Sequence, residues 1–517
     1  MKANINSIVE MLDASTAAFA KRLALVFGLK RITYRQLDEF SKKLSSALQR
    51  LGVRKDDRVA IWLHNCPEFV YSFFAVLRLG AIVVPVNTMF KREEAKFIVD
   101  DCRAKILICS IDKLQDSQNI SSRLDSLKSI ICLSAPKGDR KVIDFSTLVK
   151  ESPEFDGIIQ SQENDIAEII YTSGTTGKPK GACLSHKNLI SNIRDCSKVI
   201  RFTARDCIIC FLPLFHSFSS TVCMLLPLYR GAKIVVMRSV KPFKRVIRLI
   251  FKHRVTIFIG VPSLYNILGQ AKLSHFKLFI NFIMNPIRLC ICGAATLPLK
   301  VCENFEKKFR RPLLQGYGLT EASPVVSLNL SKGNRKLDSV GKPLPSIKVK
   351  IIDKDGKDLP SGEIGELLVK GPNVMQGYYN LEAETKKVLQ NGWLYTGDLA
   401  KVDKGGFIYI VGRLKEMINV RGFNVYPSEI EEVLYKYPQV KEAAVVGIFH
   451  RHRGEVPVAF VVADTNFDEK ELFNYLRGNL ASYKVPLRIF TRENLPKNPA
   501  GKILKRQLQE EVGRIFK

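Results

Sequence analysis

The segment Tyr171–Gly181 concentrates residue types that bind anions. It contains three glycines, two lysines and, before Lys178, five hydroxyl or phenol side chains. Glycines let the backbone approach a ligand closely, hydroxyls and free N–H groups hydrogen-bond to its oxygens, and lysines add positive charge. The segment follows the short β-branched run 166–170, which predicts a buried strand. This composition favours the binding of a polyphosphate.

The segment differs from two familiar phosphate-binding motifs. The Gly-x4-Gly-Lys-Ser/Thr pattern fails, because Thr172 stands at the position of its first glycine and Pro179 at its Ser/Thr. The region contains no Gly-x-Gly-x-x-Gly dinucleotide fingerprint either. A surface turn would account for a few such residues, but eleven in this order favour a ligand-binding segment.

Two later segments place distinctive residues at the ends of predicted strands. His216 stands among the aromatic residues of 211–218, just past a strand end, where α/β proteins bind ligands. The buried strand predicted in 288–295 runs into Gly293 and Ala294, whose small side chains leave room for a flat ring.

A third segment, Leu313–Glu321, combines three groups that suit a nucleotide. Tyr317 offers a face for stacking, and Thr320 offers a hydroxyl for a phosphate. Glu321 supplies a hard oxygen for Mg²⁺, which prefers carboxylates and phosphates.

In this order, the segments resemble the motifs of the adenylate-forming enzymes: acyl-CoA synthetases, firefly-luciferase-like enzymes and the adenylation domains of peptide synthetases. Further matches extend the resemblance over most of the chain: Trp393–Asp398, Gly405–Arg413, Gly422–Glu431 and Pro496–Lys505.

The resemblance implies roles for individual residues. Asp398 would accept hydrogen bonds from both ribose hydroxyls, for which a carboxylate has two oxygens. Lys502 would be the adenylation lysine, and the implied catalytic residues are Lys502, Thr176, Glu321 and His216, with Glu321 also as the metal ligand. The implied ATP- or AMP-binding residues are Thr172, Ser173, Gly174, Thr175, Thr176, Gly177, Lys180, Gly293, Ala294, Gly316, Tyr317, Gly318, Thr320, Asp398 and Arg413.

The same resemblance implies an acyl pocket, a coenzyme A contact and a hinge. The hinge residue would be Lys415, and ATP, Mg²⁺ and coenzyme A would be the cofactors and co-substrates. The acyl pocket would be lined by Phe215, His216, Phe218 and Val261, and Gly422 and Phe423 would contact coenzyme A.

The implied reaction joins an acid to coenzyme A through an acyl-adenylate, with release of AMP and pyrophosphate. Residues 422–427 and 211–218 look most like bacterial long-chain fatty acid–CoA ligases, which favours a medium- or long-chain fatty acid. An aryl-acid CoA ligase is an alternative within the superfamily. Plant aryl-acid ligases carry lysine at the position of Asn419 and glutamine at that of Asn424, which weakens this alternative.

Three other functions stay open. A ligase that loads an acyl carrier protein would suit the net charge of +30, and an oxidative luciferase activity is a further variant within the superfamily. A non-catalytic basic binding protein is the alternative from a different class. It would be expected to lack several of the residues above, yet the chain has all of them.

The elements that must position these residues are predicted to form an α/β fold. Short apolar strands alternate with helical patterns through the first part of the chain, which predicts layered, largely parallel sheets. Residues 339–377 switch to short strands and turns, which predicts a β subdomain, and a compact α+β unit follows. The predicted domains are 1–412, an AMP-binding N-terminal domain, and 416–517, a mobile C-terminal lid, with the hinge at 413–415.

Length, charge and cysteines bound the function further. The 517 residues exceed one usual core, so two or more domains are expected. The basic residues are spread widely without a nucleic-acid-binding motif, and the cluster 241–248 fits either a solvated helix face or a dock for an anionic bilayer.

The cysteines lie in apolar surroundings, as expected in a reducing compartment. No signal peptide is evident, and charged residues interrupt the apolar window 276–295, so we expect a cytoplasmic protein, peripheral to the membrane at most.

Overall fold

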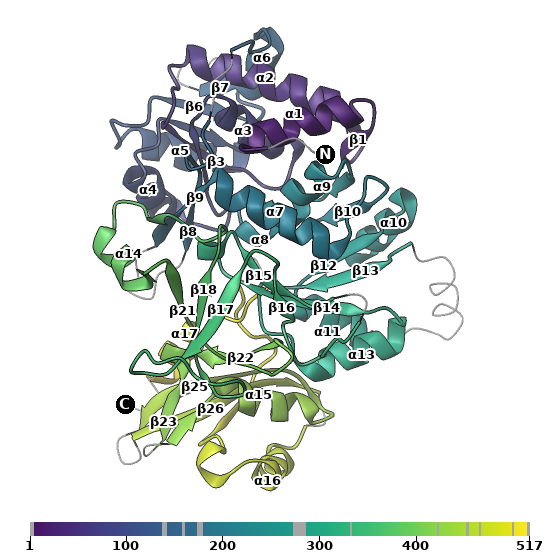
Figure 1. Ribbon diagram of the computed structural model, residues 1–517, viewed down its shortest axis with the longest axis vertical. Coiled ribbons are helices and arrows are strands. Elements are labelled where there is room, and N and C mark those ends of the chain that lie inside the picture. The colour runs from purple at the N-terminus through teal and green to yellow at the C-terminus, as the bar shows by residue number, and fades with distance from the viewer. Residues whose placement is uncertain are drawn as a thin grey trace.

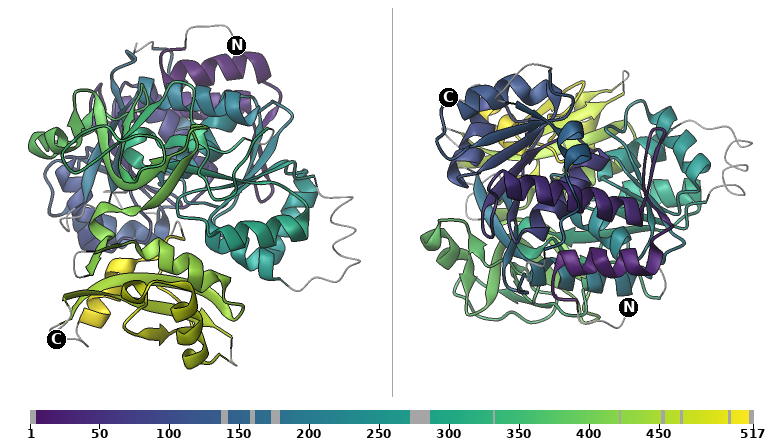
Figure 2. Two further views of the ribbon diagram at one scale, coloured as in Figure 1. Left: turned by 60° about the horizontal axis from the view of Figure 1, so that its bottom comes forward. Right: turned by 90° about the horizontal axis from the view of Figure 1, so that it is seen from above.

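The computed structural model describes residues 5–136, 142–157, 161–172, 179–271, 286–330, 333–420, 423–450, 454–464, 467–498 and 501–513. Within these residues the chain forms layered α/β sheets in a large N-terminal domain, followed by a small C-terminal domain (Figure 1). Figure 2 shows the C-terminal elements as a compact body against one end of the large domain. The predicted fold class is confirmed.

One large sheet has nine strands, parallel in its centre and antiparallel at its edges. Its central strands are apolar runs buried on both faces, as is usual for parallel sheets. In spatial order they are β16 (Lys342–Pro343), β15 (Val325–Leu328), β14 (Leu313–Gly318), β13 (Leu289–Cys292), β12 (Ile257–Gly260), β10 (Cys207–Cys210), β11 (Lys233–Val236), β1 (Leu23–Phe27) and β2 (Lys30–Thr33).

The second large sheet has eight strands and is parallel from β8 to β7. Its order is β19 (Gly377–Tyr378), β9 (Lys180–Ser185), β8 (Ile166–Thr172), β4 (Ile82–Pro85), β3 (Arg58–Trp62), β5 (Ile106–Cys109), β6 (Ser129–Cys132) and β7 (Val142–Asp144). The antiparallel pair β8 and β9 flanks the predicted phosphate segment, with Thr172 opposite Lys180.

Helices separate and cover the two sheets. A capping box between Thr33 and Gln36 begins α2, and α3 is buried along almost its whole length in the core that joins the sheets. The helices of the large domain are α1 (Ile8–Phe19), α2 (Tyr34–Arg50), α3 (Pro67–Arg78), α4 (Arg92–Asp101), α5 (Leu114–Ser121), α6 (Phe145–Glu151), α7 (His186–Ile200), α8 (Ser217–Ser219), the π-helix η2 (Ser220–Leu225), α9 (Leu226–Tyr229), α10 (Phe243–His253), α11 (Pro262–Gln270), α13 (Leu299–Phe309) and α14 (Glu382–Val388).

The last part of the chain confirms the predicted change of pattern. A five-stranded antiparallel sheet completes the large domain: β17 (Lys348–Ile352), β18 (Gly365–Lys370), β20 (Leu389–Gln390), β21 (Trp393–Val402) and β22 (Ile408–Arg413). The C-terminal domain has its own cores and contains β23 (Ile418–Val420), β24 (Phe423–Val425), α15 (Pro427–Lys436), β25 (Val440–His450), β26 (Gly454–Ala463), α16 (Glu469–Asn479), β27 (Ile489–Thr491) and α17 (Lys505–Gly513).

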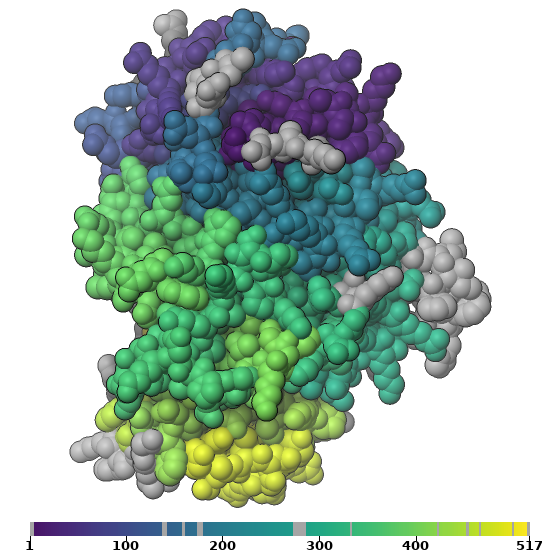
Figure 3. All heavy atoms as spheres, in the orientation of Figure 1, coloured from purple at the N-terminus to yellow at the C-terminus, as the bar shows by residue number. Residues whose placement is uncertain are grey.

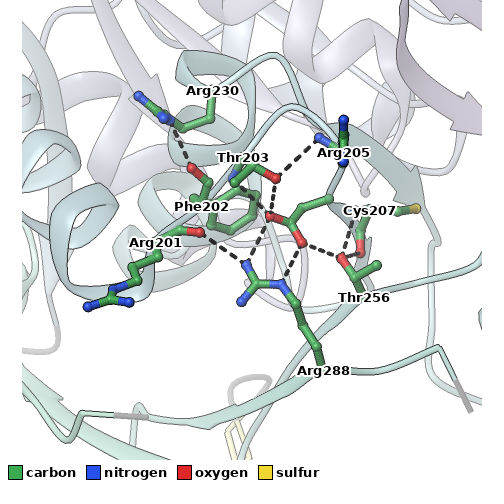
Figure 4. Close-up of polar contacts among 9 residues, drawn as sticks. Arg201, Phe202, Thr203, Arg205, Cys207, Arg230, Thr256 and Arg288 are labelled. Carbon is green, nitrogen blue, oxygen red and sulfur yellow. Dashed lines mark hydrogen bonds and ion pairs between the residues drawn. The ribbon is translucent and has the colours of Figure 1, made fainter. Parts of the chain in front are cut away.

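A buried carboxylate ties together the starts of three strands in the nine-stranded sheet (Figure 4). Asp206, just before β10, accepts hydrogen bonds from Arg288 at 2.8 and 2.9 Å and from the Thr256 hydroxyl at 2.7 Å. The backbone N–H of Thr203 adds a bond at 2.8 Å. Because Thr256 precedes β12 and Arg288 precedes β13, this network fixes the end of the sheet remote from the chemistry described below.

The cysteines behave as small core residues. All twelve are buried and free. Among the described helices, none is both long and apolar enough to cross a bilayer. The first ten residues of the apolar window 276–295 lie outside the described residues.

Candidate active site

A cavity of about 1050 Å³ opens where strands of both large sheets end. Its walls come from β8, β9, β13, β14 and the segment after β10, and the loop before α17 closes it from the C-terminal domain. In the space-filling view the C-terminal domain lies directly against the large domain (Figure 3). The predicted residues that line this cavity are Thr172, Lys180, Phe215, His216, Phe218, Gly293, Ala294, Gly316, Tyr317, Gly318, Thr320, Glu321, Arg413, Lys415 and Lys502.

Asp398, Arg413 and Tyr317 form a cluster between three strands. The register of β21 and β22 places Asp398 opposite Arg413, and their side chains form an ion pair of 2.9 Å. The Tyr317 hydroxyl donates a hydrogen bond of 2.6 Å to the other carboxylate oxygen. Asp398 lines a second cavity of about 250 Å³ that shares Gly316, Tyr317, Gly318, Ala294, Arg413 and Lys502 with the first. The carboxylate therefore faces a space with room for a polar ligand.

Small residues allow close packing at two points of the cavity wall, Gly318 and Gly293. A Cβ on Gly318 would lie 2.1 Å from the carbonyl oxygen of Pro324, so no larger residue fits there. A Cβ on Gly293 would lie 2.7 Å from the Phe218 ring, and Ala294 takes a left-handed φ of 68°. Gly293, Ala294 and Tyr317 line the same cavity, and small residues beside an aromatic ring suit a flat base.

Lys502 and His216 approach each other from the two domains. Burial, and after it the nearby Lys502 ammonium, lowers the pKa of His216 to about 4, so the imidazole is neutral near pH 7. Its Nδ1 accepts a hydrogen bond of 3.3 Å from the backbone N–H of Phe218, which places the proton on Nε2. Burial, and after it Arg413, lowers the pKa of Lys502. The pair thus offers an N–H donor beside a cation.

The end of the cavity beside the predicted phosphate segment is rich in lysines. Lys180 and Lys387 both line it, and both contact the Glu384 carboxylate at 2.5 Å. Lys180 also lies 5.3 Å from the centre of the Tyr378 ring. The predicted residues Ser173, Gly174, Thr175, Thr176 and Gly177, together with Gly422, lie outside the described residues.

The residues at Glu321 fit a magnesium ion bound with substrate phosphates. Glu321 accepts a hydrogen bond of 2.9 Å from the Tyr378 hydroxyl at Oε1, and both side chains line the cavity. No cluster of three or more histidine, cysteine or acidic residues suited to a metal occurs among the described residues. A single carboxylate is what Mg²⁺ needs from the protein when phosphates and water supply the remaining oxygens.

One wall of the cavity is apolar, and its residues escaped the sequence prediction. Cys196 and Ile200 come from the end of α7, Val222 from the π-helix η2, and Val325 and Leu328 from β15. Phe215 and Phe218 were predicted here and do line the cavity. These segments are far apart in the chain, and no local pattern indicates that they meet.

Two predicted residues line neither cavity. Val261 is buried beside the C-terminal loop, where a Cβ on Gly501 would lie 2.8 Å from its side chain. Phe423 is exposed and stacks on Tyr483 with ring centres 4.6 Å apart. The structure therefore does not bring Val261 or Phe423 to the cavity in this arrangement of the domains.

Comparisons with known proteins show the family of this chain. The family model of the AMP-binding enzymes matches residues 12–379, and the model of their C-terminal domain matches residues 429–502. The chain belongs to the AMP-binding enzyme family. It is an adenylate-forming CoA ligase, an acid–thiol ligase that uses ATP and coenzyme A.

Relatives of this AMP-binding enzyme cover nearly its whole length. A long-chain-fatty-acid–CoA ligase of Bacillus subtilis is 35% identical over 98% of this chain and 94% of the relative. The crystal structure of the anthranilate CoA ligase AuaEII in complex with anthranoyl-AMP superposes with a TM-score of 0.91 at 28% identity, covering 98% of each chain. The crystal structure of ATP-bound MatB from Rhodopseudomonas palustris superposes with a TM-score of 0.90 at 30% identity, covering 98% of this chain and 100% of that chain.

Proposed function

We propose that this enzyme activates a medium- or long-chain fatty acid and transfers it to coenzyme A. The observation that carries the proposal is the apolar wall built by α7, η2 and β15, which lines the same cavity as His216 and Lys502. An alkyl chain on this wall would place its carboxylate near the two polar groups. The Bacillus subtilis relative, named a long-chain-fatty-acid–CoA ligase, supports the same substrate class.

In the first step a carboxylate oxygen forms a bond to the α-phosphorus of ATP while the bond to the β-phosphate oxygen breaks. Pyrophosphate leaves, and the product is an acyl-adenylate. Lys502 would hold the carboxylate and α-phosphate together, and His216 Nε2–H would donate to a carboxylate oxygen. Asp398 would accept from the ribose hydroxyls, and Lys180 would bind the β- and γ-phosphates. Positioning and charge stabilisation dominate such a transfer.

Glu321 would hold Mg²⁺ together with the phosphates. When bound, the ion would neutralise charge that develops on the phosphate oxygens. The contact between Tyr378 and Glu321 Oε1 would orient the carboxylate so that its other oxygen faces the cavity.

In the second step the thiolate sulfur of coenzyme A bonds to the acyl carbon, and AMP leaves as the acyl–oxygen bond breaks. Lys502 would obstruct that approach in the present arrangement, so we propose that the C-terminal domain rotates. The pivot would be Lys415, in the 3₁₀ turn η4 (Leu414–Glu416) at the domain boundary. Rotation would bring the loop that contains Gly422 and Phe423 toward the thiol.

Pyrophosphate release with acids of increasing length tests the substrate class. Each methylene buried on the apolar wall contributes about 0.8 kcal/mol, so kcat/KM should rise roughly fourfold per methylene until the wall ends. Octanoate, dodecanoate and hexadecanoate should therefore form a rising series that levels off.

An aryl acid is the second candidate, because the superposed anthranilate ligase carries anthranoyl-AMP. If benzoate or 4-coumarate gives a higher kcat/KM than every fatty acid, the fatty-acid assignment is wrong. Coenzyme A and an acyl carrier protein should be compared as acceptors in the same experiment.

A further inference from the structure

The middle of the chain is strongly and uniformly basic. Between Asp206 and Glu303 the sequence contains no aspartate or glutamate and thirteen lysines and arginines. Lysines and arginines elsewhere on the surface commonly pair with acidic neighbours, as the ion pairs of the C-terminal domain show. Within 207–302, the one ion pair of the described residues joins Arg288 to Asp206. The positive charge of this region is therefore not balanced locally.

Much of this charge lies on α10, at the periphery of the large domain (Figure 1). The helix buries Val246, Ile250 and His253 against the core. Its exposed side carries a basic row, Lys244, Arg248 and Lys252, spaced four residues apart so that the side chains are neighbours. No ion pair of the described residues involves any member of this row. Like charges at this spacing repel, which costs helix stability unless an external anion binds.

A second, apolar row runs beside the basic one. Ile247 and Phe251 are also four residues apart and expose 42% and 37% of their surface. Most large apolar side chains of the domain are buried, so two adjacent exposed ones on a single helix are unusual. Arg245 and Arg254 add further exposed positive charge at either end.

The charge field extends to the neighbouring edge of the sheet. Burial is the main reason that the pKa of His253 lies below its ordinary value, and Lys233, Lys252 and Arg31 lower it further. Arg31 belongs to the edge strand β2, so the hairpin of β1 and β2 contributes to the same positive region. The surface combines a basic row, an apolar row and a basic flank.

We propose that α10 docks this enzyme on an anionic lipid bilayer. The basic row would lie among lipid phosphates, and Ile247 and Phe251 would insert between headgroups. A nucleic acid would match the charge but offers nothing to cover the apolar row. The delivery of fatty acid from the bilayer would be the use of this dock and rests on the proposed function, whereas the binding itself does not.

Co-flotation of the full-length protein with vesicles tests the dock. Vesicles of phosphatidylcholine are compared with vesicles that also contain phosphatidylglycerol in a roughly two-to-one mixture. We expect at least about tenfold stronger partitioning onto the anionic vesicles, weakened by salt because the Debye length falls. The double variant Lys244→Glu/Arg248→Glu should lose about tenfold or more of this partitioning. The variant Ile247→Ser/Phe251→Ser should lose severalfold while keeping the salt dependence.

The matched control is Lys470→Glu/Arg477→Glu on α16. That helix also has 11 residues, both positions are exposed, and the change in net charge is the same. The control should bind anionic vesicles like the unmodified protein. The substituted positions are exposed and line neither cavity, so all variants should stay folded and keep their activity on a short, water-soluble acid.

Several results would overturn the dock. They are equal partitioning onto neutral and anionic vesicles, no partitioning onto either kind of vesicle, and a loss of partitioning in the α16 control as large as in the α10 variant. Binding of an acidic carrier protein or of duplex DNA through the basic row, without vesicle binding, would assign the surface to a different partner. If the variants also lose activity on fatty acid presented in anionic vesicles but keep activity on the water-soluble acid, the delivery role is supported. If vesicle binding persists but no fatty acid is a substrate, the proposed function fails and the dock stands.

Discussion

Asp206 and Asp398 are both buried and both paired with an arginine, yet they serve the two ends of the fold differently. Asp206 receives hydrogen bonds from Arg288, Thr256 and Thr203 at both carboxylate oxygens, which fills its acceptor sites. Asp398 receives one bond at each oxygen, from Arg413 and from the Tyr317 hydroxyl. A carboxylate has about four lone-pair sites, so Asp398 keeps acceptor capacity toward a cavity and Asp206 does not.

The difference distinguishes a carboxylate that holds strands together from one that is available to a ligand. The number of hydrogen-bond donors at each carboxylate makes this distinction. The exposed fraction does not, because Asp206 exposes 4% of its surface and Asp398 exposes 3%. Glu168 in β8 is a third case: it exposes 1%, and its Oε1 has no hydrogen-bond partner among the described residues. Each case predicts a different response to removal of the charge.

The largest effect is expected at Asp206, whose acceptor sites are filled. Asp206→Asn leaves Arg288 without its counter-ion and should reduce the free energy of unfolding by about 3 kcal/mol, measured by urea denaturation. KM for ATP should stay unchanged below the melting temperature, because the network lies remote from the cavity. A loss of ATP affinity without a loss of stability would contradict the structural role.

The same site predicts the sign of a pH dependence. Burial alone would raise the pKa of Asp206, but hydrogen bonds from Arg288, Thr256 and Thr203 hold it below its ordinary value. The native state therefore binds the proton less readily than the unfolded state. This contribution to stability is present above the unfolded pKa of about 4 and is lost as the pH falls through the native pKa.

A smaller effect, of a different kind, is expected at Asp398. Asp398→Asn should lower kcat/KM for ATP roughly thirtyfold, about 2 kcal/mol, because a charged acceptor for the ligand is lost. The stability loss should be smaller than for Asp206→Asn. The control is Asp403→Asn, which alters an aspartate in the turn after β21 that pairs with Lys336 outside both cavities. Equal loss of ATP affinity in both variants would remove the special role of Asp398.

An effect of the opposite sign, a gain in stability, is expected at Glu168. Burial raises the pKa of Glu168 to about 8, so the native state holds a proton that the unfolded state releases above about pH 4.5. Stability should therefore fall as the pH rises from 4.5 to 8, opposite in sign to the contribution of Asp206. Glu168→Gln should stabilise the protein at pH 7, and by more at pH 9, because the amide has no charge to lose on burial. Thermal unfolding at both pH values measures this, and a variant that melts below the unmodified protein at pH 9 would refute it.

The sequence was most informative where a pattern is local. The run 166–170 predicted β8, residues 443–447 lie within β25, and the basic amphipathic cluster 241–248 falls largely within α10. Strand and helix periodicities repeat over a few residues, so neighbours along the chain reveal them.

The apolar wall of the cavity could not be predicted in this way. Ile200, Val222 and Leu328 meet only after the strands pair. The π-helix η2 inserts an extra residue per turn and shifts Val222 relative to a regular helix, which no propensity indicates. Val261, which lines neither cavity and packs against Gly501 on a loop of the other domain, stays a prediction. The roles assigned to Thr176 and Gly422 stay predictions, since both residues lie outside the described residues.

Separate measurement of the two half-reactions tests the central claim, that the cleft between the domains forms the acyl-adenylate through Lys502. Lys502→Ala should slow pyrophosphate release from ATP and palmitate by a hundredfold or more, on the order of 3 kcal/mol. The same variant should convert supplied palmitoyl-adenylate and coenzyme A to thioester within a few-fold of the normal rate. Arg506→Ala, which removes an exposed cation paired with Glu510, should leave both rates unchanged. Undiminished pyrophosphate release from Lys502→Ala would contradict the account.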